Sequence, residues 1–131
     1  MDAFEIVQWV LRIVLAVVFV AMGALHFVPR VRRGMEAMIP PGLRGTGIRS
    51  PRSLVVVSGV AEIIGGLGLL SPWEPIRFAA GIGLIALLVA VFPANAYAAR
   101  NPERFGPMAV PVGPRAAGQV VLGALVLVAA I

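Results

Sequence analysis

The chain has 131 residues, of which 60% are hydrophobic and 13% charged, and its mean hydropathy is +0.96. Soluble domains are nearer half apolar and a quarter charged, and a soluble domain of this length could not bury so much apolar surface. These values exclude a conventional soluble enzyme and predict one integral membrane domain over residues 1–131.

The net charge of +5 arises from eleven arginines against six acidic residues, and there is no lysine. In so apolar a chain, we expect this charge to orient the protein in the lipid bilayer, and we expect no nucleic-acid binding. The chain also has no cysteine. This absence excludes a disulfide, a zinc–thiolate site and autonomous thiol redox chemistry within the chain.

The first predicted membrane helix covers residues 4–28, since about 20 mostly apolar residues cross the hydrocarbon. Its start, MDAFEIVQ, is acidic, which argues against a cleaved signal peptide. Polar and small residues recur in it every three or four positions: Gln8, Arg12, Ala16, Phe19, Gly23 and His26. This spacing places them on one face of the helix, which we expect to turn toward other helices.

The second predicted helix, residues 54–70, has Glu62 at its midpoint, and Ser58, Gly66 and Leu69 share its face. A charge within the hydrocarbon costs roughly 3 kcal/mol, so it normally faces a partner inside the bundle. Residue depths, counted at 1.5 Å per residue, predict that Arg12 pairs with Glu62. By the same count His26 lies too far toward the other side to contact Glu62.

The third predicted helix, residues 78–99, has no formal charge, and its Asn95 falls at the depth of His26. We therefore expect a shallower cluster of His26 and Asn95, with Tyr97 nearby. The fourth predicted helix covers residues 114–131. Glycines within the spans allow close helix approach, which predicts an all-α four-helix integral membrane bundle; the glycines concerned are Gly59, Gly65, Gly66, Gly68, Gly81, Gly83, Gly118 and Gly123.

The connections predict the topology. The first and third, residues 29–53 and 100–115, hold nine arginines, whereas the second, residues 71–77, holds one. Cytoplasmic loops carry the excess of positive charge. We therefore expect a multi-pass protein of the inner (plasma) membrane, with the arginine-rich loops in the cytoplasm and both termini outside.

The intramembrane residues allow two interpretations. An Arg12–Glu62 pair could only fix helix register, or it could mark a ligand or proton site. A lone histidine near an interface is more often a hydrogen-bonded anchor than a metal or haem ligand, and we predict no metal site. Asn95 could simply satisfy carbonyls freed by Pro93.

Several segments together resemble the DoxX family of small four-helix membrane proteins, from about Val10 to Leu127. These segments are GALHF at residues 23–27, MEAMIPPGL at residues 35–43, the Ser-Gly-x-x-Glu-x-x-Gly pattern from Ser58 to Gly65, and VFPANAYAA at residues 91–99. The segment from Arg44 to Pro51 departs from the family, because it is longer and richer in arginine than the usual Leu-Pro-x-Pro run.

The resemblance implies an accessory or assembly subunit of a membrane redox or oxidative-stress complex. Because the first and third connections are rich in arginine, we expect partner proteins to dock on these cytoplasmic loops. His26, Glu62 and Asn95 occupy matching motif positions, and Arg12 joins them on our own interpretation of its depth. We therefore predict a ligand-binding site of Arg12, His26, Glu62 and Asn95, with no catalytic residue and no autonomous enzyme activity. One alternative is a small quinone- or ligand-binding protein, and another is a small transporter; both allow a homo-oligomer.

Overall fold

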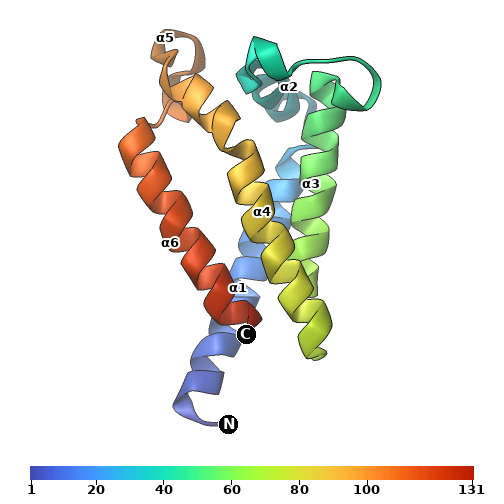
Figure 1. Cartoon of the computed structure of the whole chain (residues 1–131), viewed down its shortest axis with the longest axis vertical. Helices are drawn as coiled ribbons and strands as arrows, with labels where there is room; N and C mark the ends of the chain where they lie inside the picture. The colour runs from blue at the N-terminus through green and yellow to red at the C-terminus, as the bar shows by residue number, and fades with distance from the viewer.

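The structure is a computed structural model that describes all 131 residues, and it is entirely helical (Figure 1). Four long helices are each apolar enough to cross a membrane. They are α1 (Ala3–Leu25), α3 (Pro51–Gly68), α4 (Glu74–Ala99) and α6 (Val112–Ala130). The predicted four-helix membrane bundle is therefore confirmed, and the protein is a multi-pass membrane protein.

The helix starts follow local chemistry that hydropathy overlooks. Asp2 and Glu5 form a reciprocal capping box at the start of α1, at 2.8 and 3.2 Å. Ser50 accepts a hydrogen bond from the backbone of Ser53, with Pro51 in the first turn, so α3 begins before the predicted residue 54. Pro75 similarly sits in the first turn of α4, which begins four residues before the predicted residue 78.

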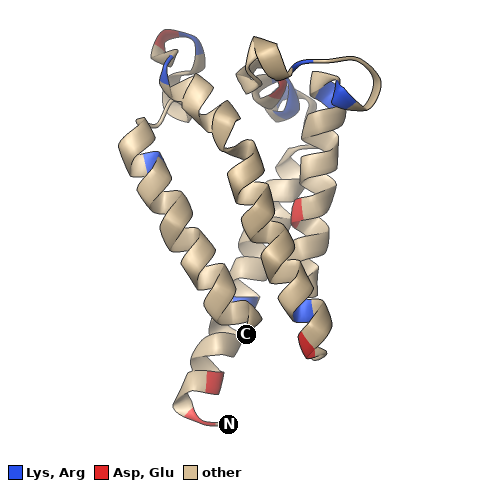
Figure 2. Ribbon diagram, viewed as in Figure 1, with Lys and Arg blue, Asp and Glu red and all other residues tan.

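The four helices form a ring in which α1 packs most extensively on α3, and α4 packs on both α3 and α6. Contact between α1 and α6 is the least extensive of the four. Both termini lie at one end of the bundle, and most basic residues lie at the other (Figures 1 and 2). The relative placement of termini and arginine-rich loops therefore agrees with the predicted topology.

Glycines set the distance and register between α1 and α3. A Cβ on Gly23 would lie 2.7 Å from the carbonyl oxygen of Gly59, and a Cβ on Gly66 would lie 3.1 Å from the Cβ of Phe19. Gly65 and Gly81 similarly face Leu84 and Ala130. The prediction of a packing role is wrong for three glycines, because their surroundings are open: Gly83, Gly118 and Gly123.

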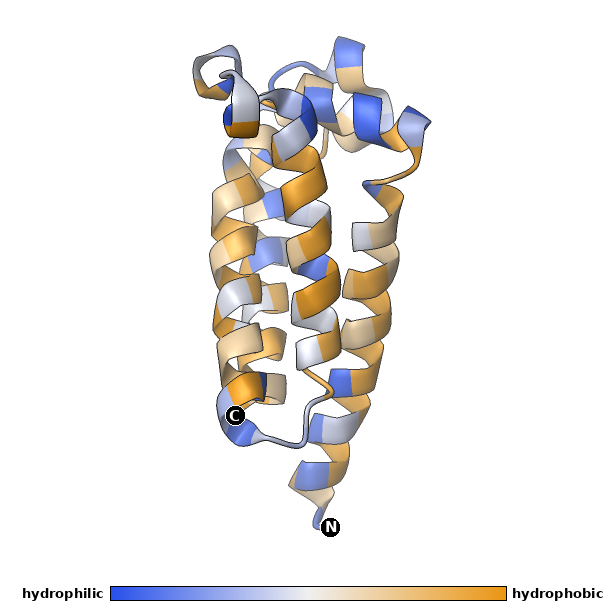
Figure 3. Cartoon of the chain, turned by 90° about the vertical axis from the view of Figure 1, so that its right-hand side faces the viewer, coloured by the Kyte–Doolittle hydropathy of each residue, from blue (hydrophilic) through white to orange (hydrophobic).

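An apolar core fills the centre of the ring. Its buried members are Leu15, Phe19, Leu69, Leu84, Val126, Ala129 and Ala130. The outer faces are apolar as well, since Val17, Val89 and Val120 are 64, 70 and 72% exposed. Hydrophilic residues gather at the two ends (Figure 3), the distribution that lipid around the helices requires.

Short helices occupy two connections that the sequence interpretation treated as loops. Helix α2 (Pro29–Met38) begins with Pro29 in its first turn, and α5 (Pro102–Phe105) also begins with a proline. Met38 and Phe105 pack together with Ala98 of α4. These contacts hold both arginine-rich connections against the C-terminal end of α4.

Candidate functional site

His26 lies at the C-terminal end of α1, and three groups of α3 converge on it. Its Nε2 is 2.9 Å from Oε2 of Glu62. Its Nδ1 is 2.9 Å from the carbonyl oxygen of Val55 and 3.1 Å from Oγ of Ser58. The hydroxyl of Ser58 donates to that same carbonyl at 2.8 Å. Both nitrogens of the only histidine in the chain therefore have partners.

These partners fix where the protons lie. A carbonyl oxygen only accepts, so Nδ1 must carry a hydrogen, which the oxygen of Ser58 shares. A 2.9 Å contact between Nε2 and Oε2 then requires one proton between His26 and Glu62. That proton resides either on the imidazole, as an ion pair, or on the carboxyl, as a neutral pair.

The site is largely enclosed. The side chains of His26 and Glu62 are 11% and 16% exposed. Oε2 of Glu62 is buried and lies 2.9 Å from the imidazole, but the geometry of this contact is not that of a well-directed hydrogen bond. The carboxylate thus keeps capacity for a further donor, as a ligand-binding or proton-exchanging group requires.

The predicted Arg12–Glu62 pair does not form, and the prediction that His26 lies too far from Glu62 was wrong. Contact between Gly23 and Gly59 brings Glu62 level with Gly23. Gly23 lies about 16 Å along α1 from Arg12 at 1.5 Å per residue. The depth count failed because it treated the midpoints of the two helices as level, whereas the glycine contacts shift α3 toward the arginine-rich end.

Arg12 instead binds the C-terminal end of α6. Its Nε donates to the carbonyl oxygen of Ala129 at 2.7 Å. Gln8 donates to the carbonyl of Val128 at 3.1 Å, and Arg77 donates to that of Ala130 at 3.3 Å. The last carbonyls of a helix lack partners within the helix and carry its negative dipole end, so these three buried donors stabilise α6.

Asn95 belongs to a third polar contact, away from His26. Its Oδ1 accepts from Nη2 of Arg115 at 3.0 Å, whereas its buried Nδ2 has no partner. The hydroxyl of Tyr97 accepts from Arg104 at 3.4 Å. The predicted His26–Asn95 cluster is therefore wrong, because α6 begins at Val112 and carries Arg115 into contact with α4.

The four predicted site residues thus divide among three places. Only His26 and Glu62 meet, and Ser58 and Val55 complete their site. Sequence reasoning placed Ser58 on the correct face of its helix but assigned it no role, and it counted Arg77 as a loop charge. Between the Arg12 layer and the His26–Glu62 pair lie Leu15, Phe19 and Leu84 of the apolar core.

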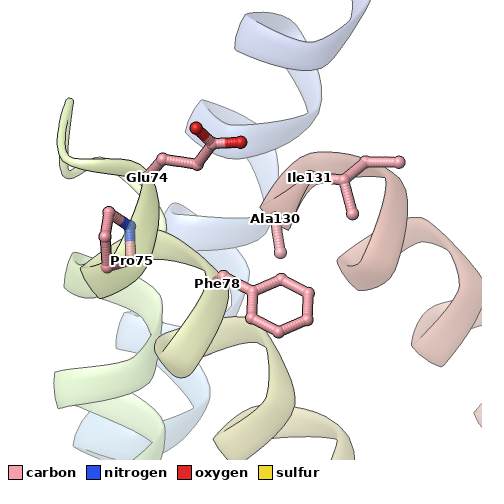
Figure 4. A pocket seen from close by; sticks show the side chains of 5 residues that line it. All are labelled: Glu74, Pro75, Phe78, Ala130 and Ile131. Carbon is pink, nitrogen blue, oxygen red and sulfur yellow. The ribbon is translucent and has the colours of Figure 1, made fainter.

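A shallow pocket lies at another place, between the start of α4 and the end of α6. It is lined by Glu74, Pro75, Phe78, Ala130 and Ile131 (Figure 4). No group of three or more histidine, cysteine or acidic side chains is placed to hold a metal ion.

Comparison with protein families gives one match. A family described as "Domain of unknown function (DUF8561)" matches residues 15–131, and the chain belongs to it. No curated protein and no solved structure matches the chain. The match includes His26, Glu62 and Asn95, and it begins after Gln8 and Arg12 of α1.

Proposed function

We propose that this member of the DUF8561 family is an accessory subunit of a membrane redox or stress-response complex, with a proton-holding ligand site at His26 and Glu62. The 2.9 Å contact between these two side chains, enclosed between α1 and α3, carries the proposal. Ionisable groups inside membrane helices are costly, so those that persist commonly mark ligand or proton sites. The resemblance to the DoxX family supports the same interpretation.

The donors at this site fit a quinone carbonyl in an apolar setting. A bound quinone would supply the electron-transfer chemistry. His26 and Glu62 would hold one proton between Nε2 and Oε2 and present it to a carbonyl oxygen, while Ser58 and Val55 keep the ring oriented. Without cysteine, the chain has no thiol pair to exchange electrons with that ligand, which favours an accessory role beside a redox partner.

The apolar layer supports a ligand site more than a transport path. Leu15, Phe19 and Leu84 separate the His26–Glu62 pair from the polar groups around Arg12. A transporter would need this layer to open during its cycle. The arginine-rich connections would face the cytoplasm of the inner (plasma) membrane and dock the partner proteins.

The experiment is quinone retention by the purified protein. We expect quinone to be extracted from the wild type and to fall at least about fivefold in Glu62→Gln, because an amide can hydrogen-bond to the imidazole but cannot take up its proton. Glu36→Gln is the matched control, since Glu36 contacts Arg32 at 3.6 Å outside the bundle core. A wild type without quinone, or equal retention in both variants, would rule out the quinone site.

Partner docking is tested separately. Deleting residues 44–49 removes Arg44 and Arg49 from the first connection and leaves Ser50, which caps α3, in place. We expect co-purifying partners to be lost from this variant. If every partner remained, the first connection would not be their docking surface.

A further inference from the structure

The end of the bundle where α1 begins and α6 ends contains two buried arginines without an acidic partner. Arg12 and Arg77 are 4% and 8% exposed. We infer that these two side chains bind a phosphate oxyanion, which either an anionic lipid headgroup or free inorganic phosphate could supply. The site is separate from the His26–Glu62 pair, and the inference does not depend on the proposed function.

Arg12 and Arg77 have no acidic partner within ion-pair distance. The ion pairs of the chain join Met1 to Glu5, His26 to Glu62 and Arg32 to Glu36, so none reaches Arg12 or Arg77. The C-terminal end of α6 offers about half a negative charge to these two full positive charges. Glu74 and the carboxylate of Ile131 also lie at this end of the bundle, but neither is within ion-pair distance of Arg12 or Arg77. Buried charges are normally paired, so the two guanidinium groups lack a counter-ion in direct contact.

A guanidinium has five N–H groups, and Arg12 uses only Nε, on Ala129. Arg77 uses Nε on Ala130 and Nη1 on Ser71, at 3.3 Å each. Terminal nitrogens of both side chains therefore have N–H groups to spare. Arginine binds phosphate through paired N–H donors, which makes a tetrahedral oxyanion a better match than a simple halide.

Arg77 donates to Ser71 in the connection between α3 and α4, where Trp73 is 69% exposed. The guanidinium of Arg12 lies 4.8 Å from the ring centroid of Trp9. Thus both tryptophans of the chain lie in the arginine layer, and tryptophan is enriched at the headgroup level of membranes. Phosphate groups of lipids occupy that level.

A capping role alone makes a different prediction. Arginines that served only the carbonyls of α6 would stabilise the bundle equally in neutral and anionic surroundings. If the two arginines bind an oxyanion, the bundle should be more stable when that anion is present, and the purified protein should retain the anion. The experiment therefore measures binding to the intact chain as well as the effect of each variant.

The test uses the full-length protein in micelles of a non-ionic maltoside detergent, which contains no phosphate, with phosphatidylglycerol or inorganic phosphate as the probe. Native mass spectrometry and the unfolding midpoint report binding. We expect a bound phosphatidylglycerol and a raised midpoint in the wild type, and at least about tenfold weaker binding in Arg77→Gln. Glutamine at residue 77 retains a donor for Ala130 but loses the charge. Competition by inorganic phosphate would identify the free anion as a source, whereas its failure to compete would identify the lipid.

Arg104→Gln is the matched control, because it removes the same charge from the opposite, exposed end of the bundle. We expect it to bind phosphatidylglycerol as the wild type does. If Arg77→Gln does not fold, Arg77→Lys, which keeps the charge but loses the paired donors, provides the second variant, and it should also bind phosphatidylglycerol more weakly than the wild type. No binding of either probe by the wild type, or equal weakening in Arg77→Gln and Arg104→Gln, would overturn the inference.

Discussion

Nε of Arg12 lies 2.7 Å from the carbonyl oxygen of Ala129, which ties α1 to the last turn of α6. These two helices share the least extensive contact around the ring, so each polar contact is a larger part of their interface than it would be between the other helix pairs. Gln8 adds a second bond one turn away, to Val128 at 3.1 Å. The charge of Arg12 therefore serves helix association rather than the His26–Glu62 site.

Replacing Arg12 should separate α1 from α6. We expect Arg12→Met to lower the free energy of unfolding by about 2 kcal/mol, because hydrogen bonds to charged groups contribute more than neutral ones. Gln8→Leu removes a neutral interhelical bond and should cost about 0.6 kcal/mol. Unfolding in mixed micelles measures both values. Arg104→Met, at an exposed position, should stay within about 0.5 kcal/mol of the wild type. An unchanged Arg12→Met variant would show that the contact with Ala129 contributes nothing.

The single histidine makes the proposed ligand site directly observable. Because Val55 can only accept, His26 should carry hydrogen on Nδ1 in its neutral form. Histidine labelled with 15N gives one pair of ring signals, whose shifts identify this tautomer. In Glu62→Gln the Nε2 signal should move and the Nδ1 signal should stay, since Val55 and Ser58 remain in place. A neutral ring protonated on Nε2 alone would contradict the geometry.

Glycine substitutions test the helix register that unites His26 with Glu62. A Cβ on Gly59 would lie 2.6 Å from the Cβ of His26 and 3.0 Å from the backbone of Gly23, so the helices must move apart. We expect Gly59→Ala to destabilise the bundle by about 2 kcal/mol, within the range for overpacking. Gly118→Ala is the control, because its surroundings are open and alanine favours a helix. Equal stability of the two variants would show that the close approach is not required.

Periodicity predicted which faces are buried, but not which residues meet across them. Gln8, Arg12, Ala16, Phe19 and Gly23 are all buried on the predicted face of α1, because the helical period alone determines that face. The partner of Glu62 depends on the axial offset between α3 and α1, and hydropathy does not specify that offset. The glycines do indicate this offset, since the close approach of Gly23 and Gly59 determines the relative axial position of the two helices.

The same distinction explains the errors at the ends of the bundle. Hydropathy assigns Arg77 and Arg115 to the connections, because a predicted apolar span is ended at the first charged residue. Both lie in the first turns of helices. Pro75 in the first turn favours the early start of α4, and α6 begins at Val112 directly after Pro111. Their targets, the carbonyl of Ala130 and the amide of Asn95, lie on neighbouring helices, and only the packing reveals them.

Orientation in the membrane can be tested without removing any native thiol, because the chain has no cysteine. Ile48 is 76% exposed in the first connection, and Pro72 is exposed in the second. The positive-inside rule places the first connection in the cytoplasm. In whole cells, a membrane-impermeant maleimide should therefore label Pro72→Cys but not Ile48→Cys, and opening the membrane should expose both. Labelling of Ile48→Cys in intact cells would show the opposite orientation, with the Arg12–Arg77 layer at the cytoplasmic headgroups.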